Sequence, residues 1–416
     1  MTEVFHMELT DTENSNHEPS YQNESMSDKE DEIYELDELP SEEPTPASDE
    51  EIYELDEKLI NPKNLRLSPN DFQLLKLLGT GGFGKNTHPD SGQLFAIKIL
   101  KKAQITRSSK DTAHTKTERS ILEQVVKNPF ICNLCYAFQT AGKLYLVMEF
   151  LAGGELFSLL ENQGVVTEDS ARFYLAEITI ALQHLHGLGI AYRDLKPENI
   201  MLDSTGHVKL TDFGLSKEKL GESDVKTYTF CGTVDYMAPE VVLRTGHGRA
   251  ADWWSLGTLL YDMLMGAPPF ASNCSKRVIE KILRSRIRLP STMSEDAQSL
   301  IKALLKRNAS NRLGAGPRDA LEIQEHSFFR TIDWQLAYNR QVHTLVAFIK
   351  FLFKLTPPFQ PTLKSVDDVS QFDRRFTEAP VVDTPYEQNG MPSSVNPFEG
   401  FSFVAPGIID KYMERS

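Results

Sequence analysis

Apolar and polar residues alternate at residues 72–78 and 144–150 in the first third of the chain, and residues 94–100 form a short apolar run with one lysine at its centre. Alternation with a period of two is typical of β-strands that bury one face. Residues 112–126 instead place apolar side chains at helical spacing. The pattern therefore predicts a small region built from strands and one helix.

Helical spacing dominates after residue 155. The predicted helices cover residues 168–188, 250–264, 278–285 and 294–306. A strand-rich region followed by a larger helical one predicts an α+β fold with two lobes. The segment after residue 329 is rich in Pro, Asp and Phe, and we expect it to run as an extended tail over the lobes.

Charge divides the chain into two unequal regions. Residues 1–57 hold 21 acidic residues and one lysine, whereas the remaining residues hold 38 acids and 43 bases. An acidic head with few apolar residues cannot offset its ordering entropy by burial, so residues 1–71 are predicted to be disordered. The sequence E-I-Y-E-L-D-E occurs at residues 32–38 and again at 51–57. Two short copies indicate a duplicated peptide and not a folded repeat.

The four cysteines of this 416-residue chain are too few for a disulfide framework and favour a reducing compartment. Cys132 and Cys135 form a C-x-x-C motif without a second pair, which favours core packing over a zinc site. We expect neither a targeting signal nor an apolar run of about 18 residues that would span a bilayer. These features predict a cytoplasmic protein, with a nuclear location left open.

Three motifs follow one another in the middle of the chain. They read Y-R-D-L-K-P-E-N at residues 192–199, D-F-G at 212–214 and A-P-E at 238–240. Phosphoryl transfer from a magnesium-bound nucleotide needs a carboxylate that orients a hydroxyl group, together with oxygen ligands for the metal. One such motif could be an ordinary polar loop, but the three in this order indicate phosphoryl transfer.

Each polar residue of these motifs has a predicted role. Asp194 would orient the substrate hydroxyl and accept its proton, and Lys196 would neutralise charge on the moving phosphoryl group. Asn199 and Asp212 would hold the metal ions.

A glycine-rich turn precedes these motifs. Gly79, Gly81 and Gly84 form G-x-G-x-x-G, in which backbone N–H groups can approach phosphate oxygens. A Rossmann dinucleotide site has the same spacing but continues directly into a helix. Here a polar stretch and then a strand centred on Lys98 follow, which favours the kinase type of loop. A buried lysine needs a partner, and we predict Glu118 on the following helix.

Three other polar residues are predicted to support the structure and not the chemistry. Glu240 and Arg312 are expected to form a buried pair. Asp252, in D-W-W-S-L-G, is expected to anchor the larger lobe.

Residues 72–403 resemble the AGC group of serine/threonine protein kinases, and within it the ribosomal protein S-six kinase family. The motifs that carry the resemblance are K-D-T-A-H-T-K (110–116), A-F-Q-T-A-G-K-L-Y-L (137–146), G-H-V-K-L-T-D-F-G (206–214) and D-D-V-S-Q-F-D (367–373). The resemblance implies a bilobal protein kinase fold. The implied divisions are a kinase domain at 72–329, a C-terminal domain at 330–405 and a short tail at 406–416.

The resemblance also implies a nucleotide site between the lobes. Met148 would be the gatekeeper, and the backbone of Glu149 and Leu151 would meet the adenine. Glu155 and Glu198 would meet the ribose or basic substrate residues, although acids at such positions could equally be solvated surface. The residues expected at the nucleotide are Leu78, Gly79, Gly81, Gly82, Phe83, Gly84, Lys98, Met148, Glu149, Leu151, Glu155 and Asp212.

Three phosphorylation sites are implied as well. Thr229 resembles an activation-loop threonine set by a phosphoinositide-dependent kinase. Thr384 resembles a turn-motif site, and Ser402 a hydrophobic-motif site set by the target-of-rapamycin complex. Each phosphate adds roughly −1.5 to −2 charge and can order a loop against cationic side chains. The aromatic residues expected to dock in an apolar groove of the smaller lobe are Phe398, Phe401 and Phe403.

Two stretches depart from the family pattern. Residues 85–93 lack apolar alternation, so we predict that the second strand of the glycine-loop hairpin is missing, and with it the cover over the adenine. Residues 341–356 are an apolar insert that would favour aggregation if exposed. A skipped coding segment at the first stretch and retained non-coding sequence at the second would explain both.

The motifs and the family resemblance together imply two alternative functions. The first is a kinase that transfers the γ-phosphate of ATP, with Mg²⁺, to Ser or Thr in Arg-rich contexts such as ribosomal protein S-six, downstream of target-of-rapamycin signalling. The second is a catalytically impaired scaffold with a kinase fold, which a truncated glycine hairpin would favour. Expected partners are protein substrates and the two upstream kinases. We expect a monomer without nucleic acid or stable membrane insertion.

Overall fold

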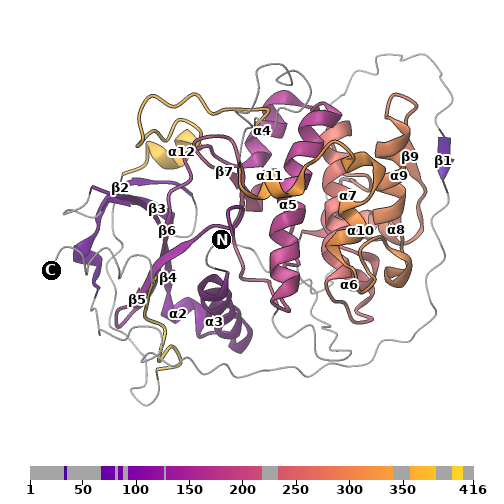
Figure 1. Cartoon of the computed structure of the whole chain (residues 1–416). Helices are drawn as coiled ribbons and strands as arrows, with labels where there is room; N and C mark the ends of the chain where they lie inside the picture. The colour runs from indigo at the N-terminus through magenta and orange to yellow at the C-terminus, as the bar shows by residue number, and fades with distance from the viewer. Residues whose placement is uncertain are drawn as a thin grey trace, which may run out of the picture.

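The computed structural model describes residues 32–34, 67–79, 83–87, 92–125, 128–217, 233–340, 357–380 and 396–405. Figure 1 shows a strand-rich lobe on one side and a lobe built around long helices on the other. The predicted α+β fold with two lobes is confirmed.

The smaller lobe is a six-stranded antiparallel sheet with two helices. Its strand order is β10-β5-β6-β4-β3-β2. Aromatic side chains fill one face, where the rings of Phe72 and Phe138 stack with centroids 5.7 Å apart. Its elements are β2 (Gln73–Leu77), β3 (Phe83–Thr87), β4 (Leu94–Lys101), α2 (Lys102–Ile105), α3 (Ser109–Gln124), β5 (Leu134–Gln139), β6 (Lys143–Glu149) and β10 (Phe403–Val404).

The strand that we predicted to be missing is present. β3 lies between β2 and β4, with Gly84 opposite Leu77 on one side and Ile97 on the other. The prediction was wrong because it required alternating side chains. Backbone hydrogen bonds to two neighbouring strands do not require them.

Helix α3 begins where the sequence offers a cap. The Ser108 side chain accepts a hydrogen bond from the Asp111 N–H group, and Asp111 also places a negative charge in the first turn. Both features stabilise a helix N-terminus. Glu118 is thereby carried, 4% exposed, on a helix beside the sheet.

The larger lobe is mainly helical. The four helices predicted after residue 155 are present within a few residues of the expected bounds. The elements are α4 (Leu156–Gln163), α5 (Glu168–Gly187), η2 (Pro197–Asn199), β7 (Ile200–Leu202), β8 (Val208–Leu210), η3 (Val234–Tyr236), α6 (Pro239–Leu243), α7 (Ala250–Met265), α8 (Ser275–Arg284), β9 (Ile287–Leu289), α9 (Glu295–Leu304), η4 (Ala309–Asn311), α10 (Ala320–Gln324), η5 (Ser327–Phe329) and α11 (Trp334–Tyr338).

Helix α7 is the centre of this lobe, with Trp253 and Trp254 fully buried. It packs closely on α9, because a Cβ atom added at Gly257 would lie 2.7 Å from the Leu304 Cβ atom. This contact requires glycine, since real Cβ atoms do not approach so closely.

Two short parts of the predicted disordered region, residues 1–71, have secondary structure. A 3-10 helix, η1 (Pro69–Asp71), precedes the sheet, and β1 (Glu32–Tyr34) pairs antiparallel with β9 of the larger lobe (Figure 1). The prediction of a disordered region is therefore wrong at these two places. A strand edge can bind a peptide through backbone hydrogen bonds alone, so the pattern of apolar residues does not predict this pairing.

The C-terminal tail crosses both lobes, as expected, and contains α12 (Arg374–Thr377) and β10. It meets the turn between β7 and β8 closely, because a Cβ atom at Gly206 would lie 2.0 Å from the Phe359 carbonyl oxygen. Gly206 also has a φ of +94°, which favours glycine. Phe398 and Phe401 are fully buried, so the expected aromatic docking is present.

Cys132 and Cys135 are buried free cysteines, in agreement with core packing. Among the described residues, we find no helix with the length and apolar character to cross a membrane. The insert at residues 341–356 lies outside the described residues.

Candidate active site

The two predicted metal ligands lie at the open end of the β7–β8 hairpin. Asn199 directly precedes β7, and Asp212 follows β8 after one residue. Thr211 links the two strands at this end, because its N–H group donates to the Asn199 carbonyl at 3.0 Å and its hydroxyl donates to the same oxygen at 3.1 Å. The hairpin therefore brings together two residues that are 13 positions apart.

The proposed catalytic carboxylate is held by its own loop. Asn199 Nδ2 donates to Asp194 Oδ2 at 2.6 Å and to the Asp194 carbonyl at 2.9 Å. Lys196 Nζ lies 3.1 Å from Asp194 Oδ2 and donates to Thr233 Oγ1 at 2.9 Å. These contacts fix the Asp194 side chain in one orientation, as positioning of a reacting hydroxyl requires.

Asp252 on α7 holds the backbone of the catalytic loop in place. Its two carboxylate oxygens accept the backbone N–H groups of Tyr192, at 2.9 Å, and Arg193, at 2.7 Å. Arg193 has a φ of 68°, a strained conformation for a residue other than glycine. Asp252 is fully buried and also contacts His186 Nε2 at 2.8 Å.

A second cluster joins three elements. Lys98 on β4 lies 2.6 Å from Glu118 Oε1 on α3 and 3.4 Å from Asp212 Oδ1. Burial alone would lower the pKa of Lys98, but the carboxylates of Asp212 and Glu118 outweigh it and raise the pKa. Lys98 in turn holds the pKa of Asp212 below its usual value. Both groups are therefore charged at neutral pH, as phosphate and metal binding require.

The two clusters influence one another. Burial raises the pKa of Asp194, and the neighbouring Lys196 opposes this, whereas the charge of Asp212 adds to it. A carboxylate with a raised pKa accepts a proton more readily, which suits a group that receives the proton of a hydroxyl.

The sequence comparisons agree with this geometry. A protein kinase domain matches residues 72–329, and a protein kinase C terminal domain matches residues 363–403. The chain belongs to the protein kinase family. The presence of both domains, together with the similarity to ribosomal protein S6 kinases, confirms the resemblance to AGC-group kinases of the ribosomal protein S-six type.

Similar kinases come from several animals. The "Ribosomal protein S6 kinase beta" of Caenorhabditis elegans is 55% identical over 357 residues, which cover 84% of this chain and 62% of that protein. The "Ribosomal protein S6 kinase alpha-1" of Homo sapiens is 49% identical over 354 residues, which cover 83% of this chain and 45% of that protein. The kinase described here thus spans roughly half to two thirds of the length of these relatives.

The donor set of the kinase site fits Mg²⁺. This cation prefers one or two carboxylates together with substrate phosphates and waters. Asp212 offers a carboxylate, and Asn199, whose Nδ2 donates to Asp194, offers an amide oxygen. No group of three or more His, Cys, Asp or Glu side chains suited to a metal is found in the described part of the chain.

The predicted nucleotide residues are only partly described. Met148 and Leu151 are buried at the end of β6 and just beyond it. Leu78 and Gly79 follow β2, while Phe83 and Gly84 lie in β3. Gly81 and Gly82 lie outside the described residues.

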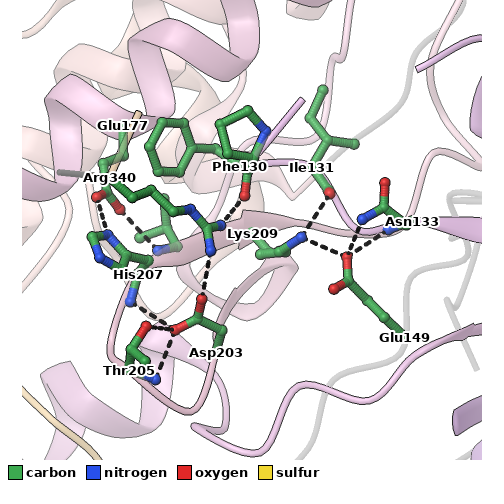
Figure 2. A network of polar contacts seen from close by, with 12 residues as sticks. Phe130, Ile131, Asn133, Glu149, Glu177, Asp203, Thr205, His207, Lys209 and Arg340 are labelled. Carbon is green, nitrogen blue, oxygen red and sulfur yellow. Dashed lines mark hydrogen bonds and ion pairs between the residues drawn. The ribbon is translucent and has the colours of Figure 1, made fainter. Parts of the chain in front are cut away.

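Glu149 has a use that the sequence did not indicate. Its Oε1 atom accepts from Lys209 Nζ at 2.6 Å and from the Asn133 backbone and side-chain N–H groups, both at 2.8 Å (Figure 2). Its side chain thus links β6 to β8, and its backbone is the part expected at the adenine.

Glu155 and Glu198 lie close enough to act on one another. Burial raises the pKa of Glu155, and the charge of Glu198 adds to this. Burial raises the pKa of Glu198, and the charge of Asp262 adds to this; burial also raises the pKa of Asp262, and the charge of Asp235 adds to it. These four acids make an acidic rim next to the catalytic loop.

Of the three predicted phosphorylation sites, Thr229 and Thr384 lie outside the described residues. Ser402 is described, and its carbonyl accepts from Arg119 Nη2 at 3.4 Å. Glu240 and Arg312 form the expected buried pair, with contacts of 2.6 and 2.9 Å.

The sequence motifs did not indicate a role for Thr233, whose hydroxyl accepts a hydrogen bond from Lys196. Its place five residues before A-P-E was the available signal. The motifs likewise did not indicate Arg340 and Asp203, which form an ion pair across 137 positions of sequence (Figure 2). Neither residue stands in a motif.

Proposed function

We propose that this chain is a serine/threonine protein kinase that transfers the γ-phosphate of ATP, with Mg²⁺. The observation that carries the proposal is the shared cluster of Asp194, Lys196 and Asn199 beside Lys98, Glu118 and Asp212. ATP supplies the phosphoryl group, and Mg²⁺ neutralises its charge. Asp194 orients the hydroxyl and takes its proton, and Lys196 and Lys98 supply positive charge.

The substrate class follows from charge. The acidic rim of Glu155, Glu198, Asp235 and Asp262 favours proteins whose Ser or Thr stands in an Arg-rich context. The relatives are named as ribosomal protein S6 kinases, which supports ribosomal protein S6 as one such substrate. We propose a cytoplasmic location for the protein, with a nuclear one as the alternative.

Regulation is proposed from the three phosphorylation sites. A phosphoinositide-dependent kinase would modify Thr229, and the target-of-rapamycin complex would modify Ser402, with Thr384 as the turn-motif site. The contacts of Arg119 with Phe401 and Ser402 support a link from Ser402 to α3. A phosphate there would add negative charge close to a buried guanidinium.

The impaired scaffold is the weaker alternative. It was favoured by the expected loss of the second hairpin strand, and β3 occupies that place. The full set of catalytic and metal-binding residues also favours transfer.

The proposed activity is tested with the purified full chain, labelled ATP and an Arg-rich peptide that contains one Ser. We expect transfer to that peptide and little to a peptide with Ala in its place. Asp194→Asn should lower the rate by about 10²–10⁴-fold, the usual contribution of a proton-accepting group. Equal rates for the two proteins would contradict the proposal.

A further inference from the structure

The β7–β8 hairpin has the proposed metal ligands at one end and the C-terminal tail at the other. At its closed end, Asp203 accepts from the Thr205 N–H group at 2.8 Å and from the His207 N–H group at 3.1 Å. Arg340 then donates through Nη1 to Asp203 Oδ2 at 2.8 Å (Figure 2). Arg340, at the start of the tail, therefore forms an ion pair with the turn of the hairpin.

The same guanidinium holds a second segment. Its Nη2 atom donates to the Pro129 carbonyl, and its central carbon lies 5.1 Å from the centroid of the Phe130 ring. Three-quarters of the Arg340 side chain is buried, and its backbone has a φ of 52°. Strained backbone persists only where the surroundings fix it, and it gathers at functional positions.

The segment that contains Pro129 runs beside β8. The Leu210 N–H group donates to the Phe130 carbonyl at 2.9 Å, and the Cys132 N–H group donates to the Leu210 carbonyl at 2.9 Å. Leu210 stands two residues before Asp212. Arg340 thus connects the turn of the hairpin to the segment that pairs with Leu210 near its metal-binding end.

Three further contacts leave the hairpin little freedom. Glu177 on α5 contacts the His207 ring and accepts from the Val208 N–H group at 2.9 Å. Lys209 Nζ lies 2.6 Å from Glu149 at the end of β6. Figure 2 shows these groups converging on one hairpin from both lobes and the tail.

We infer that Arg340 is a positioning residue for Mg²⁺-nucleotide binding, because it fixes the β7–β8 hairpin that carries Asn199 and Asp212. The inference rests on the proposed kinase function. Without the arginine, the turn loses its link to Pro129 and Phe130, and the hairpin that carries the two ligands is held less firmly against its surroundings. Loss of a partner that orients a metal ligand typically lowers metal affinity by about 10–100-fold.

The test uses the full chain and a non-hydrolysable ATP analogue in calorimetry, at low and at saturating Mg²⁺. Arg340→Gln should weaken Mg²⁺-dependent nucleotide binding by about 10-fold, the lower end for residues that orient ligands. Binding of the analogue without Mg²⁺ should stay unchanged. Asp203→Asn should also weaken Mg²⁺-dependent binding. The double variant should bind no more weakly than Arg340→Gln alone, since both single variants remove the contact between Arg340 and Asp203.

The matched control is Arg330→Gln. Arg330 is also paired with an aspartate, Asp296, but its side chain is 70% exposed and its partner belongs to α9 and not to the hairpin. This variant should bind the nucleotide as the unaltered chain does. If Arg340→Gln does not fold, Arg340→Lys decides, because lysine keeps the charge but cannot reach both acceptors with a planar fork.

The outcomes separate the two proposals. An unaltered chain that binds no Mg²⁺-nucleotide would end the proposed function. An unaltered chain that binds it, with Arg340→Gln or Arg340→Lys binding equally well, would overturn the inference alone. A loss of affinity of the same size with and without Mg²⁺ would overturn it too, because the role would then be general support of the fold.

Discussion

The catalytic loop and the Lys98–Glu118 pair both serve the same site, but they are held in place by different means. The loop is fixed within the larger lobe, where Asp252 accepts two of its N–H groups. The pair spans β4 and α3, and α3 is held in turn by the end of the tail. Arg119, next to Glu118, donates to the Phe401 carbonyl at 3.1 Å and lies 5.0 Å from the Phe403 ring.

The catalytic loop is therefore a fixed part of the site, whereas the position of the Lys98–Glu118 pair can change with the tail. The loop depends on contacts that form when the larger lobe folds. The pair depends on residues almost 300 positions away, so its position follows the state of the tail. Substitutions in the two regions should therefore change different properties.

The largest effect is expected from Asp252→Leu. Loss of the carboxylate leaves the N–H groups of Tyr192 and Arg193 buried without an acceptor, at a cost of about 1–3 kcal/mol each. Displacement of Asp194 by about 1 Å should also lower the rate about 100-fold. Denaturant unfolding and transfer assays measure the two effects.

Asp169→Leu is the control, since that aspartate is 90% exposed on α5. A stable, fully active Asp252→Leu protein would show that the loop needs no anchor in the larger lobe.

An effect of intermediate size is expected from pH, through the same anchor. Burial alone would lower the pKa of His186, but Asp252 and Asp319 outweigh it and raise the pKa to about 9. Because the folded-state value lies above the unfolded one, the stabilisation is complete below pH 6.5 and is lost as the pH rises through 9. The loss should amount to about 3 kcal/mol, measured by urea unfolding between pH 6 and pH 10.

His186→Asn should remove most of this dependence. The same slope in both proteins would assign it to other groups.

The smallest effect is expected from Phe401→Ala, which acts on the tail and not on the loop. Phe401 is fully buried against the smaller lobe. Its loss should free the tail from α3 and lower the transfer rate about 10-fold, within the usual range of coupling between distant sites. Stability of the larger lobe should stay unchanged.

Phe157→Ala is the matched control, because Phe157 is 41% exposed on α4. Should Phe401→Ala retain full activity, the pair would be as independent of the tail as the loop is.

The sequence predicted the loop better than its surroundings, for a physical reason. Asp194, Lys196 and Asn199 stand close together in one motif, so their local geometry follows from their spacing. The long helices of the larger lobe were also predicted, because each repeats its apolar face over several turns. Such signals are local, and they survive without knowledge of the fold.

The features that the sequence did not predict depend on contacts between residues that are far apart in the chain. β3 is held by hydrogen bonds from β2 and β4, and β1 by the edge of β9, whatever their side-chain patterns. Arg340 reaches Asp203 only after the chain has folded back over 137 residues. No spacing rule connects such positions.

Both flanks of residues 341–356 are fixed to a single turn. Arg340 grips Asp203, and Phe359 packs on Gly206, whose N–H group donates to the Asp203 carbonyl at 3.1 Å. The chain therefore departs from and returns to one point on the kinase. Its length there can change at little cost, because closing a longer loop between fixed ends adds only about 0.6 kcal/mol per doubling. Insertions and deletions at this point should be tolerated in evolution without moving the tail that follows.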